Sequence, residues 1–142
     1  MEQLTPDYLA LNPNGVVPTL VHDGNVIFES SVINEYLNEA LPGPSLLPED
    51  AASRATARSW IKFEDDVLHT SVKGPTNQLM LRQSFAKLPK SLVEERIARA
   101  PSSQRAEFLR KAVLGGPPDA AQVADAGATF IKAIERMEAS RV

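Results

Sequence analysis

The fold is decided by two neighbouring stretches of sequence: NPNGVVPTLV, residues 12–21, and VIFESS, residues 26–31. Asn-Pro-Asn-Gly is typical of a loop, and Pro18 at the head of a short apolar run indicates a strand that begins where no N–H is needed. Asp23-Gly24 is a strong hairpin signal because both residues tolerate the positive φ of a type I′ turn. The two stretches therefore predict a short β-hairpin.

The chemistry of this region lies in the pairs Val17-Pro18 and Glu29-Ser30. If the peptide bond before Pro18 is cis, the N–H and C=O of Val17 face outward and can pair with an extended peptide. A helix is expected directly after Glu29, and its N-terminus would hold a carboxylate at Ser30, whereas Ser30 or Ser31 can also act simply as the helix cap. Glu29 offers a carboxylate to an ammonium group. These groups together fit one zwitterionic amino-acid end and one peptide bond.

The rest of the chain is predicted to be helical. The helix after the hairpin should bury one apolar stripe and end at the proline-rich linker that starts with Pro42-Gly43-Pro44; the stripe consists of Ile33, Tyr36, Leu37 and Ala40. Further helices are expected at about 51–72, interrupted by Gly74-Pro75, and at 92–99, 104–114 and 119–139. In the last helix a buried stripe is predicted, with Gly127 allowing close packing; it consists of Val123, Gly127, Phe130, Ile134 and Met137.

Composition excludes several classes of function. The chain has 142 residues and a formal net charge of -3, which argues against nucleic acid or an anionic membrane as partner. Cysteine is absent, which excludes disulfides, thiolate metal sites and a cysteine nucleophile within these residues. With two histidines, His22 and His69, we expect no metal site. We predict a soluble, cytoplasmic protein with no membrane span.

Residues 12–39 resemble the second half of the thioredoxin-like domain of cytosolic glutathione S-transferases, and their local sequence is similar to bacterial transferases of the β-etherase type. In that family a Val-cis-Pro pair binds the cysteinyl backbone of glutathione, and a Glu/Gln-Ser pair holds its γ-glutamyl end. The resemblance implies that Val17 takes the first role while Pro18 shapes the loop, and that Glu29 and Ser30 take the second role. Glutathione is then the expected co-substrate, together with a small electrophile.

The resemblance implies an α+β fold: a partial thioredoxin-like unit of hairpin plus helix in residues 1–41, a linker in 42–49, and an all-α C-terminal-type domain in 50–142, which we expect to be incomplete. The family's β-α-β unit, which precedes the loop, takes roughly 30 residues or more and has no room before Asn12. The thiol-activating Ser, Tyr or Cys of the family belongs to that unit, so the catalytic residue is unknown here.

Three explanations remain open for this truncated pattern. The chain is a fragment of a full transferase, which we favour, or its sheet is completed by another chain, or it is a non-catalytic module for protein interactions. The family conjugates glutathione to electrophiles or cleaves ether-type bonds with it. As given, the chain is expected to bind glutathione weakly and to conjugate little or none.

Other polar residues have more ordinary interpretations. His22 is expected to steady the hairpin through a hydrogen bond, and His69 to form an i,i+4 surface pair with Asp65. In related transferases an acidic residue of the partner's first long helix reaches the glutathione ammonium, and Asp65 is the candidate for that role. Trp60 belongs to the core or to a homodimer interface around Trp60 and Asp65. Arg54 and Arg58 share a helical face at that interface.

Overall fold

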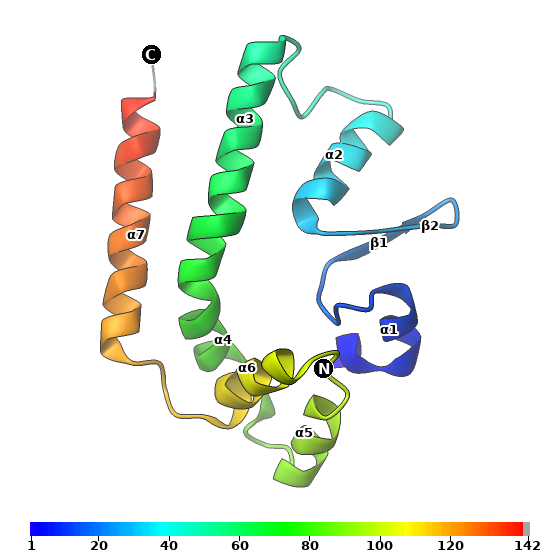
Figure 1. Cartoon of the computed structure of the whole chain (residues 1–142), viewed down its shortest axis with the longest axis vertical. Coiled ribbons are helices and arrows are strands. Elements are labelled where there is room, and N and C mark those ends of the chain that lie inside the picture. Colours follow the sequence, from blue (N-terminus) through cyan, green and yellow to red (C-terminus); the bar gives the residue numbers. More distant parts are fainter. Residues whose placement is uncertain (141–142) are drawn as a thin grey trace.

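The computed structural model describes residues 1–140. A short N-terminal part carries a two-stranded sheet, and helices follow to the end of the described chain (Figure 1). The elements are the 3₁₀ helix η1 Glu2–Leu4, α1 Pro6–Leu11, β1 Thr19–His22, β2 Asn25–Phe28, α2 Ser30–Ala40, α3 Ala51–Phe63, the π-helix η2 Glu64–Leu68, α4 His69–Phe85, α5 Lys90–Ile97, α6 Ser103–Leu114 and α7 Ala120–Ala139. The predicted α+β class, a hairpin-plus-helix unit followed by helices, is confirmed.

The predicted hairpin is present. Strands β1 and β2 are antiparallel, with Thr19 opposite Phe28 at one end, and the turn has positive φ at Asp23 (50°) and Gly24 (78°). Helix α2 buries Ile33 against this hairpin as predicted, but Ala40 is exposed because it lies at the end of the helix, where the chain turns into the linker. His22 Nδ1 lies 2.9 Å from the Tyr36 hydroxyl, so His22 ties the hairpin to α2.

The expected break at Gly74-Pro75 is wrong, because α4 continues through Pro75. Proline inside a helix removes one backbone hydrogen bond and costs about 3 kcal/mol. Helix α4 packs against both α6 and α7, and we attribute its continuity to that packing, which a local sequence signal does not report. Helices α3 and α4 are joined by the π-helix η2, so one long helical element runs from Ala51 to Phe85.

The main core joins the N-terminal turn to the helices that follow α4. It consists of Leu4, Val93, Ile97, Leu109 and Val113, all with at most 5% of their surface exposed. Leu4 comes from η1, whereas the other four come from α5 and α6. Figure 1 shows the N-terminus lying beside α6. The first residues therefore anchor the hairpin part to the helical part.

Helix α7 runs antiparallel to α3 in Figure 1. The Arg136 guanidinium lies 4.6 Å from the ring centroids of both Trp60 and Phe63, which fastens α7 to α3. The predicted buried stripe of α7 is wrong: Val123, Phe130, Ile134 and Met137 are exposed, and Ala126 and Ala133 are buried instead.

The wrong prediction for α7 has a physical cause. Amphipathicity shows that a helix has an apolar face, but it does not show which element packs against that face. The predicted close packing at Gly127 is also wrong, because a Cβ there would meet no described atom within 4 Å. Within residues 1–140, no helix is both long enough and apolar enough to cross a membrane.

Candidate functional site at the end of the hairpin

The register of the hairpin gathers the four predicted site residues. The ladder ends with Thr19 opposite Phe28, so Val17-Pro18, which precede Thr19, and Glu29-Ser30, which follow Phe28, leave the sheet at the same end. The Val17–Pro18 peptide bond is cis. All four residues are exposed, Val17 by 69%. The structure thus brings together, at one accessible end of the sheet, every residue that the sequence singled out for glutathione.

Helix α2 presents its N-terminus at this end of the hairpin. Glu29 is the N-cap residue, with φ 72° and ψ 118°, and no side chain caps the helix. The prediction that Ser30 or Ser31 caps α2 is therefore wrong, because the helix begins at Ser30 itself and the Ser31 hydroxyl donates to Asp65 instead. The first backbone N–H groups of a helix lack intrahelical acceptors, and this positive end attracts carboxylates.

The backbone of Glu29 occupies a sparsely populated region for a residue with a side chain. Such a conformation costs on the order of 1–3 kcal/mol and often marks a ligand site. It is held here by the helix that starts at the next residue, since the Ile33 N–H donates to the Glu29 carbonyl at 2.9 Å. The result is a carboxylate that projects beside the helix N-terminus in an exposed position.

A buried polar network beneath the loop holds Val16 in place. The Tyr8 hydroxyl donates to the Val16 carbonyl at 2.6 Å, and Asn12 Nδ2 donates to the same carbonyl at 3.0 Å. Asn12 Nδ2 also donates to Thr19 Oγ1 at 3.0 Å, and that oxygen lies 2.8 Å from the Tyr8 hydroxyl. Because the tyrosine proton goes to Val16, the Thr19 hydroxyl donates to Tyr8. These contacts clamp both sides of Val17-Pro18.

Sequence reasoning missed this network. Asn12 was interpreted only as part of a helix-breaking loop, yet it is completely buried, and its Oδ1 also accepts from the Asn14 N–H at 3.0 Å. The available signal was the i,i+4 spacing of Tyr8 and Asn12, which puts both on one helical face directed toward the loop. A polar pair on the buried face of a short helix needs partners.

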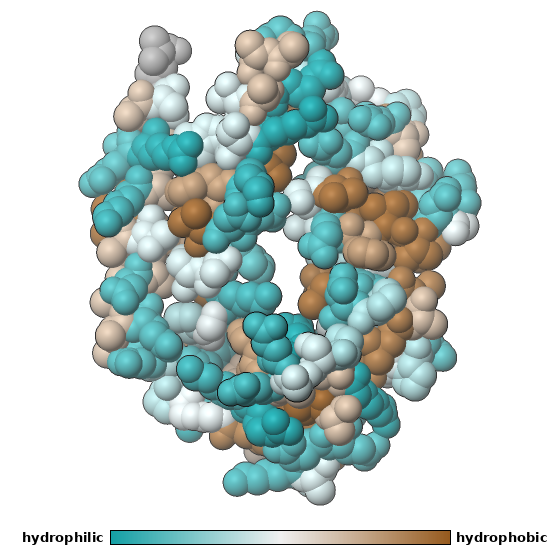
Figure 2. All heavy atoms as spheres, in the orientation of Figure 1, coloured by the Kyte–Doolittle hydropathy of each residue, from teal (hydrophilic) through white to brown (hydrophobic). Residues whose placement is uncertain are grey.

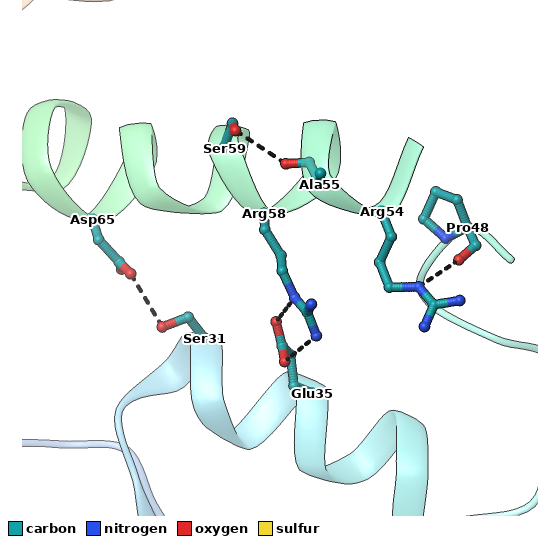
Figure 3. Close-up of polar contacts among 8 residues, drawn as sticks. All are labelled: Ser31, Glu35, Pro48, Arg54, Ala55, Arg58, Ser59 and Asp65. Carbon is teal, nitrogen blue, oxygen red and sulfur yellow. Dashed lines mark hydrogen bonds and ion pairs between the residues drawn. The ribbon is translucent and has the colours of Figure 1, made fainter. Parts of the chain in front are cut away.

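Polar contacts close to the site join α2 to α3 and to η2 (Figure 3). The Ser31 hydroxyl donates to Asp65 Oδ2 at 3.1 Å, and Arg58 holds Glu35 through two hydrogen bonds of 2.9 and 3.0 Å. The hydrogen bond from Arg58 lowers the pKa of Glu35 below its ordinary value. Arg54 donates to the carbonyl of Pro48 in the linker. Asp65, Arg58 and Arg54 all have partners within this chain, and their predicted place at a dimer interface stays a prediction.

The predicted pair of His69 and Asp65 is wrong. His69 Nδ1 lies 4.0 Å from Glu64 Oε1, one residue further back. The cause is the π-helix η2, in which hydrogen bonds run from residue i to i+5, as the His69 N–H to the Glu64 carbonyl shows. The wider turn moves the facing residue by one position. His22 forms its hydrogen bond with Tyr36, and its Nε2 lies 3.8 Å from Asp23.

Two of the cavities in the described part of the chain border helix α4. The one nearer the site has a volume of about 480 Å³ and is formed by Val16, Val17 and residues of α4 and α6. Figure 2 shows the molecule hollowed between the hairpin side and the helices. The other cavity, about 330 Å³, lies between α4, α6 and α7 and is lined by both Lys111 and Asp125. Among residues 1–140, no group of acidic or histidine side chains is arranged to hold a metal ion.

The chain is similar to several known proteins. Residues 1–40 match the family described as Glutathione S-transferase, N-terminal domain. Glutathione S-transferase 3 of Zea mays is 33% identical over 135 residues, which are 91% of this chain and 60% of that protein. Stringent starvation protein A homolog of Histophilus somni is 36% identical over 104 residues, 70% of this chain and 46% of the relative.

A solved structure with the same fold is beta-etherase LigF from Sphingobium sp. strain SYK-6. It superposes with a TM-score of 0.83 at 30% identity and covers 98% of this chain, which in turn covers 58% of LigF. The chain thus spans less than two thirds of the length of these relatives.

Proposed function

Because its sequence and fold make this chain a member of the cytosolic glutathione S-transferase family, we propose that it binds glutathione at the end of the hairpin. The observation that carries the proposal is that Val17-Pro18 and Glu29-Ser30, all of them exposed, adjoin the last ladder pair of Thr19 and Phe28 at the same end of the hairpin. In this proposal the Val17 backbone pairs with the cysteinyl backbone of the tripeptide. Glu29 receives the ammonium group of the γ-glutamyl end, and Ser30 receives its carboxylate.

The residues present suit such a ligand. A tripeptide with one ammonium and two carboxylates needs an anionic group, donor N–H groups and an open backbone edge. Glu29 supplies the anion, and the uncapped N-terminus of α2 supplies the donors. Tyr8 and Asn12 fix the carbonyl of Val16, so the adjoining edge at Val17 is already formed before a ligand arrives, which lowers the entropic cost of binding.

Bound glutathione supplies a thiol, whose thiolate form is the nucleophile toward electrophiles. The site residues of this chain position that thiol and do not abstract its proton. We propose that the activity is transfer of glutathione to an electrophilic or aryl-ether substrate, with the thiol-activating group unassigned. We further propose the division into residues 1–41, 42–49 and 50–142, a homodimer through the helices around Trp60 and Asp65, and a cytoplasmic location.

A second candidate function is a non-catalytic interaction module. It is supported by the relative whose name, Stringent starvation protein A homolog, mentions no transferase. In that case partner binding would survive changes at Glu29 and Ser30.

Titration calorimetry of the folded chain with glutathione tests the site. We expect weak binding that Glu29→Gln and Ser30→Ala each reduce about tenfold, since a hydrogen bond to a charged group contributes about 1.5–3 kcal/mol. Ser59→Ala is the matched control, because that hydroxyl bonds to the Ala55 carbonyl on α3. If a folded sample shows no binding, or if Ser30→Ala binds as well as the unchanged chain, the assignment fails.

A further inference from the structure

The cavity of about 480 Å³ beside Val17 has an unusual charge balance. Its titratable lining residues are Lys73, Arg105 and His69, and no aspartate or glutamate lines it. His69 faces Glu64 at 4.0 Å, so the two uncompensated charges are those of Lys73 and Arg105. Within the part of the chain that the structure describes, neither of them forms a salt bridge. The cavity is therefore cationic.

Both cations converge on one aromatic ring. The Lys73 Nζ lies 5.5 Å from the centroid of Phe108, and the Arg105 guanidinium carbon lies 5.3 Å from it. Such contacts stabilise a cation only modestly compared with a carboxylate partner. Two cations at one ring also repel each other, and the repulsion is strongest where water is excluded. An anion between them would remove this cost.

Arg105 also lacks a hydrogen-bond partner at one of its nitrogen atoms. Its Nε is buried and has no hydrogen-bond partner among residues 1–140. A buried donor without an acceptor destabilises the fold, and the cost is larger when the group is charged. Burial also lowers the pKa of Arg105 from its ordinary value. The Arg105 guanidinium therefore carries a charge beside the cavity that no group among residues 1–140 compensates, and a carboxylate in the cavity would offset it.

The cavity adjoins the proposed glutathione site. Val17 forms part of its wall and is also the residue that we assign to the cysteinyl backbone. Apolar walls from Val72, Leu81 and Leu109 suit the hydrocarbon part of a small molecule. We propose that this cavity receives the second substrate and selects electrophiles that carry a carboxylate, with Lys73 and Arg105 as the specificity-determining residues. This inference rests on the proposed glutathione site.

Two glutathione conjugates of equal length test the inference without requiring catalysis. S-hexylglutathione ends in a methyl group, and S-(5-carboxypentyl)glutathione ends in a carboxylate on a chain of the same number of carbons. In calorimetry at low salt, we expect the carboxylate conjugate to bind the 142-residue chain roughly tenfold more tightly. Lys73→Met and Arg105→Met should each reduce this preference and leave the affinity for S-hexylglutathione unchanged. Arg110→Met is the control on the same helix, because Arg110 pairs with Glu94 instead.

The outcomes separate this inference from the function on which it rests. If neither conjugate binds a folded sample, the glutathione site itself fails. If both bind equally well, or if the preference survives in Arg105→Met, only the selection of anionic electrophiles is overturned. It is likewise overturned if Arg105→Met weakens glutathione but not its glycyl ethyl ester, because the cations would then hold the glycyl carboxylate of the tripeptide.

Discussion

At the scale of single residues, the site depends on side chains that no ligand would touch. Tyr8 and Asn12 hold the Val16 carbonyl and Thr19 on the two sides of Val17-Pro18. A ligand-binding edge built from backbone atoms has no side chain of its own to define it. Its precision must therefore come from the groups that fix the neighbouring peptide units, and here these groups lie on α1.

Removal of the Tyr8 hydroxyl should loosen this edge. Tyr8→Phe deletes one of the two donors to the Val16 carbonyl and leaves the other, so we expect a loss of about 1 kcal/mol in the free energy of unfolding and weaker glutathione binding. The measurements are urea denaturation and calorimetry. Tyr36→Phe is a matched control, because Tyr36 is the only other tyrosine and its hydroxyl bonds to His22. Equal affinity for glutathione in the two variants would contradict the role of Tyr8.

The residues of the candidate site could be predicted from the sequence, whereas the tertiary contacts of the residues that support them could not. Val17, Pro18, Glu29 and Ser30 stand out because they match the pattern of the family that the sequence resembles and flank the two strands of the hairpin, whose ladder ends at Thr19 and Phe28. The predicted capping role of Ser30 and Ser31 is wrong, since Ser31 has a partner on η2 that local spacing does not reveal. The burial of Asn12 likewise depends on tertiary packing.

At the scale of elements, local sequence signals predict the limits of the helices well, but they do not predict the contacts between helices. Turn and cap residues predicted α5, α6 and α7 close to their observed limits. The π-helix η2 had no sequence signal, and it changed the partner of His69 from Asp65 to Glu64. Pro75 is tolerated inside α4, a helix with neighbours on two sides.

The contact between α2 and α3 should give stability a dependence on acid pH. Arg58 lowers the pKa of Glu35 in the folded chain, so folding favours the ionised carboxylate. This contribution is present above the unfolded pKa of Glu35 and is lost as the pH falls through its folded pKa. Glu35→Gln should therefore show a smaller decrease in Tm than the unchanged chain when the pH is lowered from neutral into the acid range.

The size of this effect should be small, because both side chains are partly exposed and salt screens them. Arg58→Met should flatten the same acid dependence, whereas Arg54→Met should leave it unchanged, since Arg54 donates to the Pro48 carbonyl. Thermal melts at several pH values provide the measurement. They are carried out in low salt and in about 0.5 M salt, at which the Debye length falls to about 4 Å. A similar acid slope in all three variants would rule out the Glu35–Arg58 pair as its origin.

At the scale of the whole molecule, the hairpin part and the helical part share one core. Leu4 lies among Val93, Ile97, Leu109 and Val113, although it precedes the hairpin by more than a dozen residues. The sequence predicted two parts because composition changes after the linker, but composition does not reveal a side chain that inserts across the divide. The exposed apolar face of α7 has the same explanation. Helical periodicity predicts that a helix has an apolar face, but it does not predict which element packs against that face.

Leu4 should therefore stabilise both the fold and the site. It is fully buried, and Leu4→Ala should cost about 2–5 kcal/mol in the free energy of unfolding. The loop before Val17 rests on it, because a Cβ added at Gly15 would lie 3.0 Å from the Leu4 side chain. Glutathione affinity should consequently fall even at temperatures where the variant remains folded. Leu11→Ala is the matched control, since Leu11 is 43% exposed and should change the free energy by less than about 1 kcal/mol.

Hydrogen exchange distinguishes a shared core from two independent ones. If Leu4 joins the two parts, Leu4→Ala should speed the exchange of amides in β1 and β2 as well as in α5 and α6, because the hairpin loses its attachment when the core opens. The hairpin alone, with two strands, is only marginally stable in water. Faster exchange confined to α5 and α6, with unchanged protection in the hairpin, would show that the N-terminal turn does not carry the site, and the loop would then owe its position to Tyr8 and Asn12 alone.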